Sequence, residues 1–145
     1  MTKAKIQAAK EPNGLTRTDG KRPDGVTLVP WSHGRCMAWD VTVPDTLAAS
    51  HLDITSIAAG AAAEYAAVNK TNKYTDILHT YDFTPVAVET LGAWSDSALN
   101  FVKQLGRRLT DATSDNLETA YLLQRLSVAI QRCNAICFAG SFERI

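Results

Sequence analysis

Two acidic residues, Asp24 and Asp40, carry the clearest chemical signal in this sequence. Asp24 follows Pro23 at the start of one apolar run, and Asp40 lies in the middle of a second apolar run, Met37–Val43. An ionised carboxylate is seldom buried in apolar surroundings unless it is paired with a cation or bound to a metal. Two strands joined by a short turn would bring Asp24 and Asp40 together, where their charges repel. A divalent cation with hard oxygen ligands would relieve this repulsion, so we expect the two acids to bind a metal ion.

A structural interpretation of the same acids competes with the metal site. Asp24 lies in a Pro-Asp-Gly sequence, which is common in tight turns. Asp40 could instead accept a hydrogen bond from neighbouring backbone, or pair with Arg22 or Arg35. The residue types by themselves leave both interpretations open.

Two lysines downstream could supply the positive charge that phosphodiester hydrolysis needs. A metal holds the scissile phosphate and lowers the pKa of a water molecule, and a nearby cation neutralises the charge that develops. Thr42, two residues after Asp40, cannot supply this charge. Lys70 and Lys73 lie three residues apart in a predicted helix, so both could point toward the acids. Lysines are also common at solvated helix ends. We favour Lys70, because the helix should carry later residues away from the sheet.

The composition fits a single globular domain without an overall charge bias. The chain has 145 residues, of which 46% are hydrophobic and 21% are charged, which is enough for one domain with a proper core. The 15 basic residues balance the 15 acidic residues, so no global positive field indicates nucleic acid. No apolar run approaches a membrane span. The 3 cysteines, in a chain without a signal peptide, fit reduced thiols. We therefore expect an intracellular domain without membrane contact.

The apolar pattern predicts an α/β domain after a loose N-terminal segment. Residues 1–14 lack a sustained apolar period and are expected to form a flexible tail, which leaves residues 15–145 as the folded domain. Strands are predicted at Val26–Val29, Met37–Val43 and Phe83–Thr90. Helices are predicted from Thr55 or Ser56 to about Tyr74, from Ser95 to about Thr110, and from about Asn116 to Ala139. The order β-β-α-β-α-α implies a small mixed sheet flanked by helices.

The last predicted helix carries an apolar stripe. Asp115 and Glu118 match a capping box at its start, and Gly140 is a natural stop. Its buried face is expected to contain Leu122, Leu126, Ala129, Ile130, Cys133 and Cys137. Because both cysteines fall on this stripe, we interpret them as small hydrophobic residues rather than as zinc ligands with His33 and Cys36.

Several motifs, taken in order, resemble one family of nucleases. They are the RPD of residues 22–24, the DVTV of residues 40–43, the Lys70-x-x-Lys73-Tyr74 motif and the PVAVETLGAW of residues 85–94. Together they resemble the restriction-enzyme-like endonuclease domain of site-specific non-LTR retrotransposon polyproteins, over roughly residues 17–136. That domain belongs to the PD-(D/E)XK nuclease fold.

The resemblance implies a restriction-endonuclease-like fold and a DNA endonuclease that depends on Mg²⁺ or Mn²⁺ and nicks the target strand. Carried over by position, Asp24 and Asp40 would be metal ligands, Lys70 or Lys73 the catalytic lysine, and Tyr74 the aromatic residue that accompanies it. The resemblance also implies DNA and a reverse transcriptase region of a larger polyprotein as partners, and a nuclear location. The alternative function is a catalytically inactive relative that binds nucleic acid or protein through the same scaffold.

Overall fold

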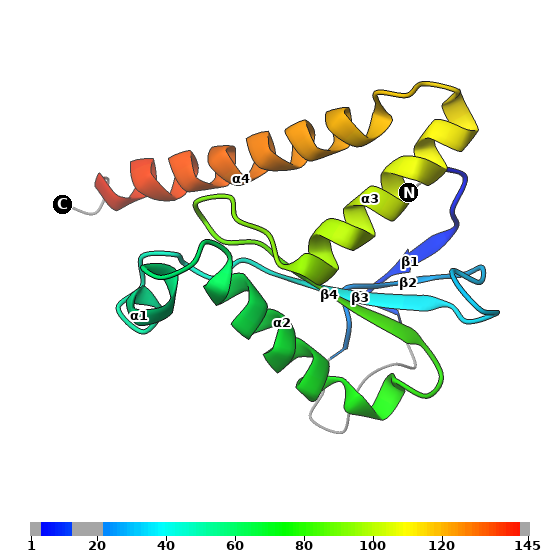
Figure 1. The fold of residues 1–145 in the computed structure, drawn as a ribbon, viewed down its shortest axis with the longest axis horizontal. Coiled ribbons are helices and arrows are strands. Elements are labelled where there is room, and N and C mark those ends of the chain that lie inside the picture. The colour runs from blue at the N-terminus through cyan, green and yellow to red at the C-terminus, as the bar shows by residue number, and fades with distance from the viewer. Residues whose placement is uncertain (1–3, 13–21, 143–145) are drawn as a thin grey trace.

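A four-stranded mixed sheet forms the centre of the domain and carries helices on both faces (Figure 1). The computed structural model describes residues 4–12 and 22–142. The strands, in spatial order, are β1 (Ala8–Lys10), β2 (Gly25–Thr27), β3 (Met37–Thr42) and β4 (Asp82–Ala87). The pairs β1–β2 and β2–β3 are antiparallel, whereas β4 runs parallel to β3. The predicted α/β class, with a small mixed sheet flanked by helices, is confirmed.

The helices divide between the two faces of this sheet. They are α1 (Leu52–Thr55), α2 (Ala61–Lys73), the short 3-10 helix η2 (Thr75–Ile77), α3 (Asp96–Thr113) and α4 (Glu118–Phe142). Figure 1 shows α2 on one face, and α3 with the crossing α4 on the other. Parallel strands need a crossover connection, and α2 lies within the one that joins β3 to β4.

Small side chains let α2 lie close to the sheet, as its alanine-rich sequence predicts. Ala63 and Ala67 of α2 pack on Ala87 of β4, and all three are buried. The predicted single helix from Thr55 or Ser56 to Tyr74 is wrong at its start, because Gly60 adopts a left-handed conformation (φ 85°) and separates α1 from α2. Such a conformation favours glycine and interrupts a helix.

The opposite face holds the larger core, and part of it comes from the N-terminal segment. Ala4 and Ile6 are buried with Trp31, Met37 and Leu109. Residues 8–10 form β1, which pairs with β2. The described part of residues 1–14 therefore differs from the expected flexible tail, whereas residues 1–3, 13–21 and 143–145 lie outside the described residues. β1 is too short to show an apolar period, and only its pairing with β2 defines it.

The two C-terminal helices confirm some predictions and correct others. Ser95 caps α3 as predicted, because its side chain accepts a hydrogen bond from Ala98 N at 3.3 Å. The Asp115 carboxylate accepts from Leu117 N instead of forming the predicted capping box. The predicted stop at Gly140 is wrong, since α4 continues to Phe142. The predicted burial of Cys133 is also wrong.

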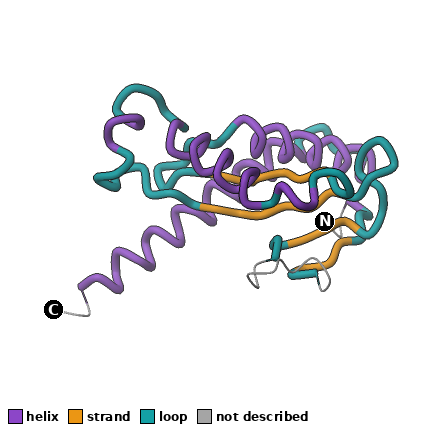
Figure 2. Tube along the Cα trace, turned by 90° about the horizontal axis from the view of Figure 1, so that it is seen from below, coloured by secondary structure: helices purple, strands orange, loops and turns teal. Residues whose placement is uncertain are grey.

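On α4 the predicted buried face is only half-buried near the sheet and exposed further along. Leu122, Leu126 and Ile130 are half-buried, but Ala129, Cys133 and Cys137 are exposed. Figure 2 shows the physical reason, because the C-terminal half of α4 projects away from the sheet and the other helices. The apolar period of the helix is real, but no other part of the described chain covers its far end.

Two glycines in these helices give a matched test of the α3–α4 contact. A Cβ added to Gly106 would lie 2.3 Å from Thr119 Oγ1, whereas one added to Gly140 meets no atom within 4 Å. We expect Gly106→Ala to lower the free energy of unfolding by about 1–3 kcal/mol through overpacking. Gly140→Ala should raise it by up to about 1 kcal/mol, since alanine favours the helix. Urea denaturation of both variants measures these effects, and equal stability of the two would contradict the packing of α3 on α4.

Candidate active site

The register of β2 and β3 brings Asp24 opposite Asp40. Gly25 pairs with Trp39 and Val26 with Ala38, so one residue further along the same register Asp24 faces Asp40. Directly opposed residues of antiparallel strands project to the same face of the sheet, with Cβ atoms about 4.5–5.5 Å apart. Because side chains alternate along β3, Asp40 lies on the face that carries α2, whereas Trp39 stacks against Phe101 of α3.

Lys70 is the cation that the structure brings to Asp40. Its Nζ atom lies 2.6 Å from Asp40 Oδ2, and the two side chains are 25% and 4% exposed. Oδ2 is buried and accepts no well-directed hydrogen bond from the described residues. The contact is therefore a close ion pair, in which the ammonium group of Lys70 neutralises the buried carboxylate. Burying a carboxylate in this way is unfavourable unless a cation stays beside it.

Asp24 has a different environment, at the edge of the same site. Its side chain is exposed, and Oδ2 accepts a hydrogen bond from Val41 N at 2.7 Å. Its carbonyl oxygen accepts from Glu11 N at 2.8 Å. The backbone just after β1 and the backbone of β3 therefore hold Asp24 from both sides.

Lys73 and Tyr74 contact each other and not the acid pair. Lys73 Nζ lies 4.7 Å from the centre of the Tyr74 ring. Tyr74 is buried, its ring packs on Phe83, and its hydroxyl donates to the carbonyl oxygen of Arg22 at 2.8 Å. Because Arg22 lies two residues before Asp24, Tyr74 ties the end of α2 to the segment that carries this acid. A catalytic role for Lys73 or Tyr74 stays a prediction.

Sequence reasoning missed one further acid in the same row. Lys10 pairs with Gly25, so the next residue, Glu11, lies opposite Asp24, and Glu11, Asp24 and Asp40 form a row across three strands. Glu11 Oε2 accepts from Arg22 at 2.7 Å, which turns the side chain outward. No sequence pattern indicated β1, and without this strand nothing places Glu11 beside Asp24.

The arrangement offers two carboxylates and one ammonium group on the face of the sheet that carries α2. No three acidic, histidine or cysteine side chains among the described residues converge closely enough to enclose a metal ion. Mg²⁺ often binds through only one or two carboxylates and completes its shell with water and phosphate oxygens. Asp24 supplies an exposed carboxylate, and Asp40 supplies a second one opposite it on the neighbouring strand. Because Lys70 Nζ already lies 2.6 Å from the buried Asp40 Oδ2, these residues fit a divalent cation only together with a shift of Lys70 away from this oxygen.

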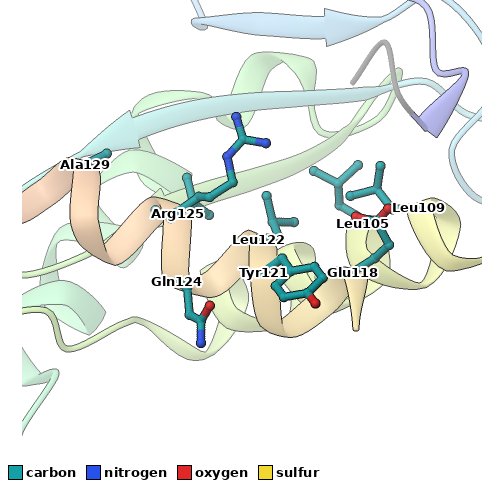
Figure 3. Close-up of a pocket in the computed structure, with 9 residues that line it drawn as sticks. Leu105, Leu109, Glu118, Tyr121, Leu122, Gln124, Arg125 and Ala129 are labelled. Carbon is teal, nitrogen blue, oxygen red and sulfur yellow. The ribbon is translucent and has the colours of Figure 1, made fainter. Parts of the chain in front are cut away.

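A hollow with a volume of about 660 Å³ lies between α3 and α4 (Figure 3). Asp24, Asp40 and Lys70 are not among the residues that line it. Its walls are mainly leucine side chains such as Leu105 and Leu109, and its charged groups are Glu118 and Arg125. In Figure 3 these two groups lie at different ends of the hollow. We therefore place the candidate site at Asp24 and Asp40, beside Lys70, and not at this hollow.

Comparison of the chain with known protein families, with characterised proteins and with solved structures finds no match. Within the described residues, none of the helices is both long and apolar enough to cross a lipid bilayer. The interpretation of the site therefore depends on the geometry of its own residues.

The ion pair predicts unequal effects of the two neighbouring lysines on stability. Lys70→Met leaves Asp40 buried without its cation, so it should lower the free energy of unfolding by about 3 kcal/mol in metal-free buffer. Lys73→Met removes only a contact with an aromatic ring and should cost about 1 kcal/mol or less. Urea denaturation with EDTA measures both values. Adding Asp40→Asn to Lys70→Met should restore part of the loss, and an unchanged or larger loss in the double variant would contradict the pairing.

Proposed function

We propose that this domain is a metal-dependent DNA endonuclease, derived from a retroelement, that nicks the target strand by hydrolysing a phosphodiester bond. The observation that carries the proposal is the placement of Lys70 at 2.6 Å from the buried Asp40, with Asp24 opposite on the next strand. Two acids that hold a divalent cation and a lysine beside them are the groups this hydrolysis needs.

Each group has a distinct role in the proposed reaction. Asp24 and Asp40 would hold the cation from two neighbouring strands. When bound, Mg²⁺ or Mn²⁺ supplies Lewis acidity toward the phosphate and lowers the pKa of a water molecule. Lys70 projects from α2 toward the same point and would stabilise negative charge that develops on the phosphate oxygens. Tyr74 would act indirectly, by holding the backbone before Asp24 through its hydrogen bond to Arg22.

The architecture supports the restriction-endonuclease-like part of the proposal. The sheet is small and mixed, and both of its faces carry helices, as the resemblance to retrotransposon nuclease domains implies. The lysine lies on a helix instead of two residues after Asp40, where the chain has Thr42. We extend the proposal to DNA as substrate, to a reverse transcriptase region of a larger polyprotein as partner, and to a nuclear location.

One observation favours the second candidate, a catalytically inactive relative that binds nucleic acid or protein. Each acid already has a partner inside the protein, since Lys70 neutralises Asp40 and Val41 N hydrogen-bonds to Asp24. A relative that no longer binds a metal ion could retain both contacts because they stabilise the fold. Direct measurement of metal binding and cleavage separates the two candidates.

Asp24→Asn is the sharpest test of catalysis, because it removes the charge while the side-chain oxygen can still accept from Val41 N. We expect wild type to nick supercoiled plasmid with Mg²⁺ or Mn²⁺ and not with EDTA. The variant should lose at least about 100-fold in rate, as expected when one catalytic group is removed, at an unchanged melting temperature. Gel electrophoresis of plasmid forms measures the rate.

A matched control is Asp111→Asn, which removes an exposed acid from α3, on the face of the sheet opposite to α2. This variant should nick at the rate of wild type. Nicking by Asp24→Asn at the wild-type rate would remove Asp24 from the mechanism. Absence of both nicking and calorimetric Mg²⁺ or Mn²⁺ binding in the wild type would favour the inactive relative.

A further inference from the structure

The C-terminal end of α4 is an uncovered apolar surface. Ile136, Phe138 and Phe142 are 71%, 68% and 61% exposed. Residues 133–142 contain no charged side chain, and Figure 2 shows this part of the helix projecting beyond the rest of the domain. A helix that is apolar on all sides is normally buried against other protein or in a membrane. The far end of α4 is therefore expected to have a partner.

The same molecule carries an apolar groove between α4 and the sheet. Its lining includes Trp39, Val41 and Val43 on the β3 side, Val86 and Trp94 on the β4 side, and Ile130 of α4. Its volume is about 350 Å³. Asn134 of α4 donates to the carbonyl oxygen of Thr90 at 2.7 Å, which ties the helix to the loop after β4. This hydrogen bond holds α4 beside that loop next to the groove, which Asn134 also lines.

The groove has the size of the apolar group that lies at the end of α4. Phe138 and Phe142 lie one helical turn apart, and their rings form an edge-to-face pair with centres 4.9 Å apart. A protein cavity of about 150 Å³ holds one benzene molecule, so about 350 Å³ corresponds to two such rings. Because α4 is one continuous helix, Phe138 and Phe142 cannot turn back into the groove of their own chain.

We propose that two copies of this chain form a symmetric dimer in which the Phe138–Phe142 pair of each copy enters the apolar groove of the other. A two-fold axis makes such an exchange reciprocal, so both exposed helix ends and both grooves are covered at once. This inference is independent of the proposed nuclease activity, since it uses none of the residues of the acid site.

Charge and area both favour a second copy over other partners. The lack of charge over residues 133–142 offers nothing to phosphates or to a charged peptide. Each phenylalanine buries about 150–250 Å². Phe138 and Phe142 are 68% and 61% exposed, so about two-thirds of this area is left to bury. With an equal area of groove, two reciprocal insertions therefore bury on the order of 1,000 Å², which is at the low end for specific interfaces. Each copy carries both the phenylalanine pair and the apolar groove, so a second copy provides a complementary surface for each of them.

The test compares the oligomeric state of wild type with that of variants on each half of the contact. Light scattering after size-exclusion chromatography at tens of micromolar should give a dimer for wild type. It should give monomers for Phe138→Glu/Phe142→Glu and for Val43→Glu, at unchanged circular dichroism because these side chains are largely exposed. Ile57→Glu, at a residue that is 85% exposed on the α1–α2 connection, is the matched control and should stay dimeric.

Mixing the two monomeric variants tests reciprocity. The phenylalanine variant retains its groove and the Val43→Glu variant retains its phenylalanines, so one of the two contacts can form and a heterodimer should appear at higher concentration. A dimer that survives Phe138→Glu/Phe142→Glu, or one that Ile57→Glu also abolishes, would overturn the proposal. A monomeric wild type would overturn it too, and flotation of that monomer with phosphatidylcholine vesicles would assign the surface to a membrane.

Discussion

The burial of the Asp40 charge beside Lys70 is the constraint on which the candidate site depends. Asp40 lies in the central part of the sheet and is 3% exposed, so its charge requires a cation supplied by another element. Lys70 meets this requirement from the last turn of α2. The ion pair therefore links a strand to the helix that crosses over it, and it sets how far along β3 the end of α2 lies. Tyr74, one turn further, adds a second link through the Arg22 carbonyl.

The rest of the α2 face is built so that this approach is possible. Ala63 and Ala67 allow the helix to lie close to Ala87. Buried Glu89 accepts hydrogen bonds from Ala62 N and Ala63 N, and it thereby satisfies two of the free N–H groups at the start of α2. One acid thus holds the N-terminal end of the helix, and Asp40 holds a lysine at its C-terminal end. The result is a helix held at both ends that places Lys70 against Asp40, and fixed placement of reactive groups is what catalysis would need.

The opposite face has another physical character. It consists of large apolar and aromatic side chains, in which Trp31 and Trp39 contact Phe101 and Arg108 packs over the Trp31 ring. This packing leaves a hollow between α3 and α4 and an apolar groove between α4 and the sheet, and the phenylalanines at the end of α4 are exposed. The two faces thus divide the molecule into a polar side, which presents the candidate site, and an apolar side, which presents the candidate interface.

The sequence alone determined the elements whose signals are local. Apolar alternation located β3 and β4, Ser95 marked the start of α3, and the isolated acid in the Met37–Val43 run identified Asp40 as costly to bury. Contacts between segments that are distant in sequence decided the other features of the site and of α4. Glu11 joined the acid row only because β1 adds to β2. The sequence favoured Lys70 over Lys73, but its contact with Asp40 depends on the rotation of α2 above the sheet. The sequence alone also did not determine what covers the apolar stripe of α4. An apolar period shows that a helix has a face to bury, but it does not show whether the same chain covers that face. Periodicity and capping act within a few residues, whereas register, helix rotation and burial depend on contacts between segments that are distant in sequence.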